Sequence, residues 1–522
     1  MERTDISVLV TEAALDVPER RALVESSGRA LTWAELEDQV ARISTGLGAL
    51  GLLAGHRVMI VLGNRIEFVT TYLGVLRAQA VAVPVNPRST SDELSRMIAD
   101  SGSRLVVVDA AAADVVRRAL ADLGSADAPR VAVVDGPTQG DELAFEALLA
   151  DVARAVPPLP DGEKLAALLY TSGTSGRPRA AMLSHRALLA NIEQVASVEP
   201  PMMHGDDVVL GALPLFHVYG LNAVLGGVLR HRARLLLVDR WDPQAALDLI
   251  DDEACSVLPL APPVFAHWLP DEHLKERLGP VRLVLSGSAP LAAEVIRSFT
   301  DITGIPVHQG YGLTEASPVV TSTLCSRSAP SEDDKLLASV GAALPGVELR
   351  LVDESGAVIT DEDPGRIQVR GDNLFSGYWP DGADGPDAEG WWSTGDVGFL
   401  DAGGDLFLVD RVKELVIVSG FNVYPTEVED VLREVDGVEE AAVIGVPDEM
   451  TGEAVVAYVV SDSLDPAAVV EAVEEHISTR LARFKRPTRI EVVDELPVTV
   501  TGKVQKGRLR GMERRRHLGL LE

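Results

Sequence analysis

Tyr170 to Arg179 read YTSGTSGRPR, and the apolar letters LAALL come directly before them. The stretch consists mostly of Thr, Ser and Gly and ends with two arginines, Arg177 and Arg179. Backbone N–H groups, hydroxyls and cations in one loop are suited to hold an anion such as polyphosphate. A plain Ser/Gly turn between two strands is an equal alternative for this loop taken alone. A Walker loop is excluded, because Gly173 and Gly176 are too close together and no Lys-Ser/Thr pair follows.

Outward from this loop, short apolar runs alternate with helical stretches. The runs before the loop are RVMIVLG, AVAVPVN, RLVVVD and RVAVVD. This alternation is typical of a largely parallel sheet with crossover helices. Thr32 and Glu35 match a capping box, which predicts the start of an amphipathic helix. After the loop, Ser184 is expected to cap the helix HRALLANIEQV.

Two stretches resemble a dinucleotide-binding motif and a membrane span, respectively. Gly46 to Gly51 read GLGALG and match the dinucleotide fingerprint, but they end a helix instead of joining a strand to one. The residues between Asp207 and Arg230 carry no formal charge and are numerous enough to span a bilayer. Pro214, His217 and Asn222 interrupt that run. We therefore expect a buried strand, a turn and a buried helix there.

Length, charge and cysteine content limit the class of protein. A chain of 522 residues, 46% hydrophobic, predicts two or more domains. The net charge of −32 argues against general affinity for nucleic acid or anionic membranes. Cys255 and Cys325 have no paired spacing, so neither a disulfide framework nor a cysteine metal site is expected. The first residues lack a signal-peptide pattern, and we expect a cytoplasmic protein. The oligomeric state stays open, a homodimer included.

The second half of the chain carries several residues suited to bind a nucleotide. Tyr311 offers a stacking face and Glu315 a carboxylate for a divalent cation, although both residue types are often plain surface residues in loops. The run VRLVLSGSAPL ends in a small-residue turn that leaves room for a flat ring. Asp396, in STGD, is a suitable acceptor for ribose hydroxyls or a simple Asx-turn aspartate. Lys503 follows a Thr-Gly turn at the start of a basic tail.

Changes in pattern predict the domain boundaries. From Val340, short β runs separated by Gly, Pro and Asp turns predict a small β subdomain. Residues 410–413, DRVK, form a charged joint, and an α+β unit of about a hundred residues follows. We expect an α/β protein with a large N-terminal domain of mixed and parallel sheets over residues 1–409, including the β subdomain. A hinge at 410–413 and a small mobile α+β domain over 414–522 complete this prediction.

Several words of the sequence resemble, in order and spacing, the adenylate-forming (ANL) superfamily. They are YTSGTSGRPR, LPLFHVYG, YGLTE, STGD, DRVKELVIVSGFNVYP and TGKVQK. That superfamily includes acyl-CoA synthetases, aryl-CoA ligases, luciferases and peptide-synthetase adenylation domains. The joint segment, with SGFNVYP, looks most like that of bacterial fatty-acid–CoA ligases.

The resemblance implies a two-step reaction on a small-molecule carboxylic acid, expected to be a fatty acid. The carboxylate attacks the α-phosphorus of ATP with Mg²⁺ to give acyl-AMP and pyrophosphate. The thiol of coenzyme A then displaces AMP. Because a carboxylate meeting a triphosphate is anion against anion, the site must concentrate positive charge that the acidic surface cannot supply.

The resemblance also implies a role for each matching residue. Lys503 is expected to bridge the acyl carboxylate and the α-phosphate. Thr174 and Glu315 are expected near the magnesium. His217 and Tyr219 are expected between the acyl channel and the reacting carboxylate. The other implied positions are Thr171, Ser172, Gly173, Ser175, Gly176 and Arg179 at the phosphates; Gly287, Ser288, Ala289, Gly310, Tyr311, Gly312, Leu313 and Thr314 at the adenine; Asp396 and Arg411 at the ribose; Lys413 as the hinge; and Ser419 and Gly420 at the pantetheine arm.

The phosphate loop departs from the family pattern at its end. The usual form is Lys-Pro-Lys-Gly, whereas this chain has Arg177, Pro178, Arg179 and Ala180. Arginine keeps the charge and adds a planar fork, and alanine removes some backbone freedom. Other functions stay open: an acyl-AMP ligase that delivers to a carrier-protein thiol, a luciferase-like oxygenase, and a catalytically silent nucleotide-binding regulator. A serine hydrolase is disfavoured, because the sequence has no Gly-x-Ser-x-Gly elbow.

Overall fold

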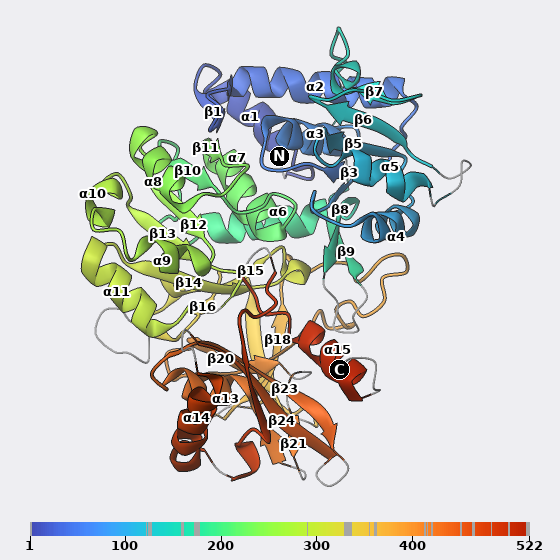
Figure 1. The fold of residues 1–522 in the computed structure, drawn as a ribbon. Helices are drawn as coiled ribbons and strands as arrows, with labels where there is room; N and C mark the ends of the chain where they lie inside the picture. The colour runs from blue at the N-terminus through green and yellow to red at the C-terminus, as the bar shows by residue number, and fades with distance from the viewer. Residues whose placement is uncertain are drawn as a thin grey trace. The chain divides into compact units, whose positions relative to one another are not determined.

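The computed structural model describes residues 3–121, 123, 128–157, 161–171, 178–289, 291–327, 337–353, 355–359, 363–411, 414, 416–418, 421–448, 452–461, 465–481, 483–499 and 502–517. The chain forms two compact units, drawn in Figure 1. The N-terminal unit comprises Met1–Glu348 and Arg370–Trp392, and the C-terminal unit comprises Leu349–Val369 and Ser393–Glu522. The boundary expected after residue 409 falls inside a strand, β20 (Leu406–Arg411).

A seven-stranded sheet in the N-terminal unit confirms the parallel pattern that the apolar runs predict. Its strand order is β7-β6-β5-β3-β4-β8-β9, and only the β8–β9 pair is antiparallel. The strands are β3 (Arg57–Val61), β4 (Val81–Pro84), β5 (Leu105–Asp109), β6 (Arg130–Val134), β7 (Leu143–Ala144), β8 (Leu165–Thr171) and β9 (Arg179–Ser184). The helices between them are α3 (Ile66–Arg77), α4 (Ser91–Ser101), α5 (Ala113–Ala121) and the 3₁₀ helix η1 (Phe145–Leu148).

A nine-stranded sheet forms the rest of the N-terminal unit, with order β16-β15-β14-β13-β12-β10-β11-β1-β2. Its strands are β1 (Arg21–Glu25), β2 (Ala30–Thr32), β10 (Val208–Gly211), β11 (Arg234–Leu237), β12 (Val257–Leu260), β13 (Leu283–Ser286), β14 (Val307–Gly312), β15 (Val319–Ser322) and β16 (Ala342–Ala343). The other helices of the N-terminal unit include α1 (Val8–Asp16), α2 (Trp33–Ala49), α6 (His185–Ala196), α8 (Pro243–Asp252), α9 (Pro263–Trp268), α10 (Leu274–Arg277) and α11 (Ala293–Thr303), with the 3₁₀ helices η3 (Thr314–Ala316) and η4 (Thr323–Cys325).

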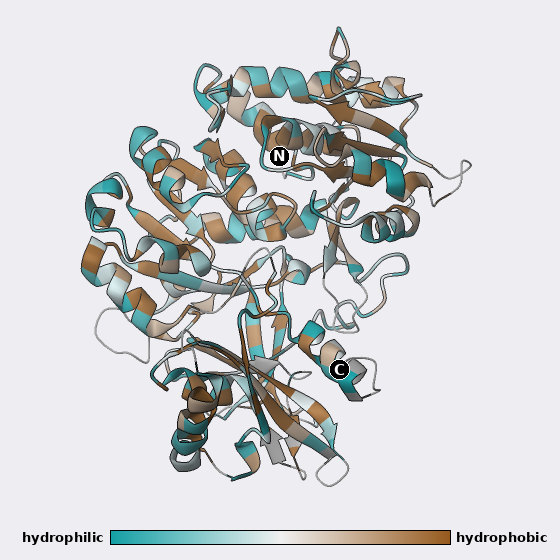
Figure 2. Cartoon of the chain, viewed as in Figure 1, coloured by the Kyte–Doolittle hydropathy of each residue, from teal (hydrophilic) through white to brown (hydrophobic). Residues whose placement is uncertain are grey.

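Each sheet packs its apolar side chains against helices, and the central strands are coloured as hydrophobic in Figure 2. In the seven-stranded sheet, Met59 and Val61 pack in one cluster with residues of α4 and α5. Beside the nine-stranded sheet, Phe265 of α9 and Phe299 of α11 pack in one cluster with its strand residues and meet edge to face at 5.2 Å between ring centroids. Both sheets are therefore anchored by buried apolar cores, which leaves the ends of their strands free to carry polar loops.

The predicted helix starts are confirmed. Thr32 Oγ1 accepts from the N–H of Glu35, and the Glu35 carboxylate accepts from the N–H of Thr32. The Ser184 hydroxyl accepts from the N–H of Ala187 at the start of α6. Gly46 lies inside α2, where an added Cβ would come within 2.0 Å of the Leu148 carbonyl oxygen. GLGALG therefore ends a helix, as expected, and its first glycine also permits close packing.

The uncharged run between Asp207 and Arg230 also folds as predicted, except that part of its helix is a π-helix. Strand β10 opens it, and a turn leads into a helix that continues to His231. The first part of this helix, η2 (Tyr219–Gly226), is a π-helix, and α7 (Gly227–His231) follows it. Among the described residues, no helix is long and apolar enough to cross a membrane. Periodicity cannot distinguish a π-helix from an α-helix over so few residues.

The C-terminal unit contains two sheets. The four-stranded sheet has the order β17-β18-β19-β20, and the five-stranded sheet has the order β22-β21-β24-β23 with β25 beside β24. The strands are β17 (Glu348–Val352), β18 (Gly365–Arg370), β19 (Trp392–Leu400), β20, β21 (Val416–Val418), β22 (Phe421–Val423), β23 (Val438–Asp448), β24 (Gly452–Ser461) and β25 (Arg489–Val493). The helices are α13 (Pro425–Arg433), α14 (Pro466–Arg480), η5 (Arg483–Lys485) and α15 (Lys506–His517). This arrangement confirms the α+β character expected for the end of the chain.

Candidate functional site

The phosphate-loop candidate joins two antiparallel strands of the seven-stranded sheet. Thr171 is the last residue of β8, Arg179 is the first residue of β9, and the two are partners across the ladder. The expected phosphate contacts from Ser172 to Gly176 lie outside the described residues, and so does the expected magnesium ligand Thr174. Their roles stay predictions. The strands place the two ends of the loop side by side, as a loop that encloses a ligand requires.

One tyrosine lies between the exit of this loop and the predicted magnesium carboxylate. The Tyr378 hydroxyl donates to Oε1 of Glu315 at 2.6 Å. The Arg179 guanidinium lies over the Tyr378 ring, with its carbon 3.8 Å from the ring centroid. Nη1 of Arg179 also pairs with Oδ2 of Asp384 at 2.8 Å. The positive charge of Arg179 is therefore already partnered by a carboxylate.

The segment that carries Tyr378 binds both sides of the candidate site. We call residues 373–380 the bridging segment. Its backbone and the Asn373 side chain form hydrogen bonds with β9 and with the short helix η3 that contains Glu315. These hydrogen bonds are Ser376 N to Met182 O (2.9 Å), Met182 N to Gly377 O (3.0 Å), Trp379 N to Ala180 O (2.9 Å), Phe375 N to Glu315 O (2.9 Å) and Asn373 Nδ2 to Ala316 O (2.8 Å). The bridging segment thus links two loops that are far apart in the sequence.

Two buried asparagines hold the Glu315 loop from the opposite side. Nδ2 of Asn222, on η2, donates to the carbonyl oxygen of Ser317 at 2.6 Å. Oδ1 of Asn191, on α6, accepts from the N–H of Val319 at 3.0 Å. Buried amides with satisfied hydrogen bonds fix the backbone around them. Glu315 itself is only 8% exposed, so its carboxylate is mostly buried.

The Glu315 carboxylate fits the role of a magnesium ligand. Tyr378 occupies Oε1, and Oε2 has no hydrogen-bond partner among the residues that the structure describes. Carboxylate oxygens are the protein ligands that Mg²⁺ prefers. A mostly buried anion with one unused oxygen is suited to receive a cation.

The glycines of the predicted adenine segment are required by strand packing. A Cβ on Gly310 would lie 2.8 Å from the Thr321 carbonyl oxygen, and one on Gly312 would lie 2.3 Å from the Pro318 carbonyl oxygen. Both carbonyls belong to the neighbouring β15 region. Tyr311, between the two glycines, is buried and donates its N–H to Thr321 Oγ1 at 3.3 Å. These contacts fix the backbone of the segment. The adenine contacts expected for Gly310, Tyr311, Gly312, Leu313 and Thr314 stay predictions.

The second predicted adenine segment touches the predicted acyl pocket. A Cβ on Gly287 would lie 2.6 Å from Cε1 of Tyr219, so the tyrosine ring rests directly on this glycine. Ser288 follows with a positive φ of 76°, which turns the chain sharply before Ala289. Burial raises the pKa of Tyr219, so this side chain stays neutral at physiological pH. Two groups of residues that the sequence assigns to different substrates are therefore adjacent.

A buried asparagine positions the turn that carries His217. Nδ2 of Asn64 donates to the carbonyl oxygens of Gly211 (2.9 Å) and Leu213 (2.8 Å), and its Oδ1 accepts from the N–H of Leu215 (2.9 Å). The N–H of His217 then donates to the Pro214 carbonyl oxygen at 3.1 Å. The turn between β10 and η2 is therefore fixed from the first half of the N-terminal unit. His217 keeps its expected role as a prediction.

The predicted ribose ligands pair within the C-terminal unit. Asp396 in β19 and Arg411 in β20 are partners across the antiparallel ladder. Asp396 is buried, and its N–H donates to Thr394 Oγ1 at 3.1 Å. For Arg411 only the backbone is described, and Lys413, Ser419 and Gly420 lie outside the described residues. The register alone brings Asp396 and Arg411 together, as a shared ribose site requires.

Lys503 lies on a tight turn, as the sequence predicts. Gly502 before it has a φ of 79°, a value that glycine adopts without strain. The N–H of Lys503 donates to Thr499 Oγ1 at 3.1 Å, and the N–H of Thr499 donates to the Lys503 carbonyl oxygen at 2.8 Å. Three residues later, Lys506 forms ion pairs with Glu429 (2.8 Å) and Glu414 (3.3 Å). The turn is thus held on both sides within the C-terminal unit.

Comparison with known proteins agrees with this geometry. The model of the family "AMP-binding enzyme" matches residues 10–379, and that of the "AMP-binding enzyme C-terminal domain" matches residues 427–503. The chain belongs to the AMP-binding enzyme family. Its membership in the adenylate-forming superfamily, predicted from the sequence words, is confirmed, and the chain is an AMP-forming acid–thiol ligase.

Relatives of this AMP-binding enzyme match nearly its whole length. A 4-coumarate–CoA ligase-like protein from Oryza sativa subsp. japonica is 35% identical, over 96% of this chain and 92% of the relative. The ATP-bound crystal structure of MatB from Rhodopseudomonas palustris is 34% identical, with a TM-score of 0.87 and coverage of 98% and 99%. A Mycobacterium tuberculosis fatty acyl CoA synthetase is 29% identical, with a TM-score of 0.76 and coverage of 98% of each chain.

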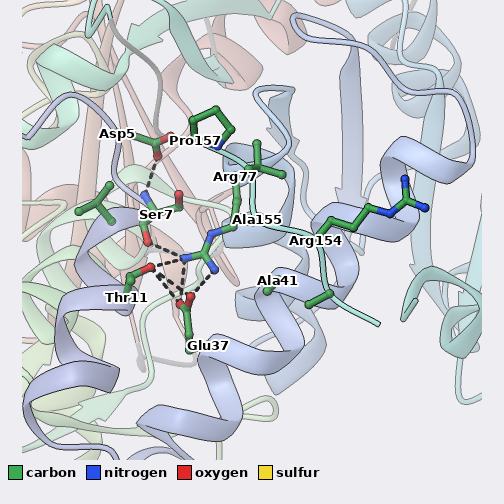
Figure 3. Close-up of a pocket in the computed structure, with 12 residues that line it drawn as sticks. Asp5, Ser7, Thr11, Glu37, Ala41, Arg77, Arg154, Ala155 and Pro157 are labelled. Carbon is green, nitrogen blue, oxygen red and sulfur yellow. Dashed lines mark hydrogen bonds and ion pairs between the residues drawn. The ribbon is translucent and has the colours of Figure 1, made fainter. Parts of the chain in front are cut away.

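The AMP-binding enzyme also has a pocket away from the predicted residues, drawn in Figure 3. Its volume is about 390 Å³, and Arg77 lies at its wall. The Arg77 guanidinium donates to the Glu37 carboxylate, to Thr11 Oγ1 and to the Ser7 carbonyl oxygen. These groups hold the Arg77 guanidinium within the N-terminal unit. None of the residues that the sequence analysis assigned to ATP or to the acid lines this pocket.

Sequence reasoning about this AMP-binding enzyme missed Tyr378, Asp384, Asn64, Asn191 and Asn222. The asparagines give no local signal, because each acts through backbone groups distant in the sequence. The bridging segment does carry a signal: aromatic residues cluster in NLFSGYWP, between a strand and a Gly/Asp-rich turn. A tyrosine in such a cluster could have been tested as a partner for the predicted acidic ligand.

Proposed function

We propose that this acid–thiol ligase is an ATP-dependent acyl-CoA synthetase whose acid has an extended apolar tail. The acid and ATP give acyl-AMP and pyrophosphate, and coenzyme A then gives the acyl-CoA and AMP. The observation that carries the proposal is the link from Arg179 through Tyr378 to Glu315. It joins the exit of the expected phosphate loop to the carboxylate expected to hold the cation.

The proposed chemistry divides among the residues of the two units. Glu315, with Thr174, would hold Mg²⁺, which when bound supplies positive charge to the phosphate oxygens. Lys503 would neutralise the reacting carboxylate and the α-phosphate as they meet, because two anions repel each other. Asp396 would accept the ribose hydroxyls, and Arg411 would donate to the ribose.

The thioester step needs a different nucleophile at the same acyl group. We propose that Lys413 lies at a hinge that allows this exchange, and that Ser419 and Gly420 face the pantetheine arm of coenzyme A. A mobile joint is useful here because one site must serve two successive reactions. The CoA step distinguishes this function from an acyl-AMP ligase that delivers to a carrier protein.

We propose aryl acids as the first class of substrate and fatty acids as the second. A relative at 35% identity is named a 4-coumarate–CoA ligase-like protein, which supports the aryl class. The sequence around the joint and the Mycobacterium tuberculosis relative support the fatty class. Tyr219 and the buried apolar residues of η2 would offer an apolar wall to either tail.

The experiment is pyrophosphate release with ATP and Mg²⁺ across 4-coumarate, benzoate and aliphatic acids of increasing length. We expect release with at least one acid, and AMP release that then requires coenzyme A. If pyrophosphate is released but coenzyme A does not increase AMP release, delivery to a carrier-protein thiol is favoured. Absence of pyrophosphate release with every acid would favour a silent nucleotide-binding regulator.

A further inference from the structure

We propose that Tyr378 is a positioning residue that orients Glu315 toward the cation of bound ATP, and that Arg179 and Asp384 clamp Tyr378 in place. This inference rests on the proposed function, because it concerns the adenylation step. We call Arg179, Tyr378 and Asp384 the tyrosine clamp. It assigns to Arg179 a role different from the direct phosphate contact expected from the sequence.

The first step is the hydrogen bond between Tyr378 and Glu315. At 2.6 Å, it is a short charge-assisted bond from a hydroxyl to a carboxylate. An ionised carboxylate can only accept hydrogen bonds, so the Tyr378 hydroxyl is the donor. A donor fixed on Oε1 sets the rotation of the carboxylate and leaves Oε2 for a ligand.

The second step is the arginine that replaces the usual lysine. Its guanidinium lies over the Tyr378 ring at 3.8 Å, while one edge reaches Asp384 at 2.8 Å. A planar guanidinium can stack on a ring and pair with a carboxylate at the same time. A lysine ammonium, a compact charge on a flexible stem, lacks this geometry. The departure from the family pattern is therefore explained by the clamp.

The third step is the backbone that connects the clamp to both loops. The N–H of Trp379 donates to Ala180, next to Arg179, and the N–H of Phe375 donates to the Glu315 carbonyl oxygen. Tyr378 thus belongs to a segment tied at one end to β9 and at the other to η3. These bonds fix the Tyr378 hydroxyl relative to the Glu315 carboxylate.

The direct test is Tyr378→Phe, which keeps the ring under Arg179 and removes only the hydroxyl. Loss of a hydrogen bond to a charged group lowers a binding constant by about 10- to 100-fold. We expect calorimetry to show that Mg²⁺ tightens ATP binding about tenfold less in this variant than in the natural chain. ATP affinity without Mg²⁺ should change little, because the ring and the loop remain.

Tyr458→Phe is the matched control, because Tyr458 makes the same kind of bond to Glu513 in the C-terminal unit. We expect this control to bind ATP with the same magnesium response as the natural chain. Asp384→Asn tests the clamp independently, because it releases Arg179 without touching Tyr378. Combined with Tyr378→Phe, it should add little further loss, since both changes act on one carboxylate.

Each outcome decides one point. If the natural chain releases pyrophosphate and Tyr378→Phe keeps its full magnesium response, the tyrosine clamp is wrong while the proposed function stands. Fully additive losses in the double variant would also overturn the clamp. If the natural chain releases no pyrophosphate with any acid, the proposed function fails. Calorimetry would still report whether Tyr378 governs Mg²⁺ binding.

Discussion

Gly287 lies against the Tyr219 ring, where the positions predicted for adenine and for the acid meet. An added Cβ at this position would lie 2.6 Å from the Tyr219 ring, closer than carbon atoms pack. We predict that Gly287→Ala displaces that ring at a cost of about 1–3 kcal/mol, as overpacked sites show. The measurement is the KM for the acid and for ATP, both of which should rise.

Gly48→Ala is the matched control for this prediction. Gly48 lies in α2, and an added Cβ there would meet no atom within 4 Å. Its KM values should match those of the natural chain. Unchanged KM values in Gly287→Ala would show that Tyr219 does not line the substrate site.

Lys503 is the residue on which adenylation is expected to depend most. Removing one preorganised charge donor lowers a rate by about 10²–10³. We predict that Lys503→Ala lowers acid-dependent pyrophosphate release by this factor. Lys485→Ala, which removes a lysine paired with Glu427, serves as the control and should leave release unchanged. A loss confined to the coenzyme A step would contradict the role of Lys503.

At the scale of elements, an ion pair connects the end of the Lys503 turn to the segment before β21. Lys506 pairs with Glu414, which directly follows Lys413. We predict that Lys413→Pro slows thioester formation more than pyrophosphate release, because proline fixes φ where a hinge must rotate. The measurement is the rate of each half-reaction. Lys413→Ala, which leaves the backbone free, is the control, and equal losses in both half-reactions of Lys413→Pro would rule out a hinge.

The elements that local sequence determines could be predicted, and those that distant contacts determine could not. Thr32 and Ser184 cap their helices as expected because a cap acts within one helical turn. The π-helix at Tyr219 could not be foreseen, since its buried Asn222 is held by Ser317. The bridging segment is a similar case, because its partners lie in β9 and η3.

At the scale of the whole molecule, the six sequence words determined the family and the reaction class. They could not assign the partners of Arg179, because Asp384 and Tyr378 come from outside every word. Nor could they place the four strands β17 to β20 within a compact unit, since that depends on pairing between strands. Motifs therefore predicted the family and the reaction class, but not the contacts that hold the predicted site residues in place.

The net charge of −32 makes local cations decisive for a protein that must bind ATP. The central claim is that such cations allow a carboxylate to attack ATP before coenzyme A takes part. The most direct measurement is a single-turnover assay with acid, ATP and Mg²⁺, in which pyrophosphate and AMP are followed separately. We predict release of pyrophosphate without coenzyme A, and release of AMP only after coenzyme A is added. Pyrophosphate that appears only when coenzyme A is present would contradict the account.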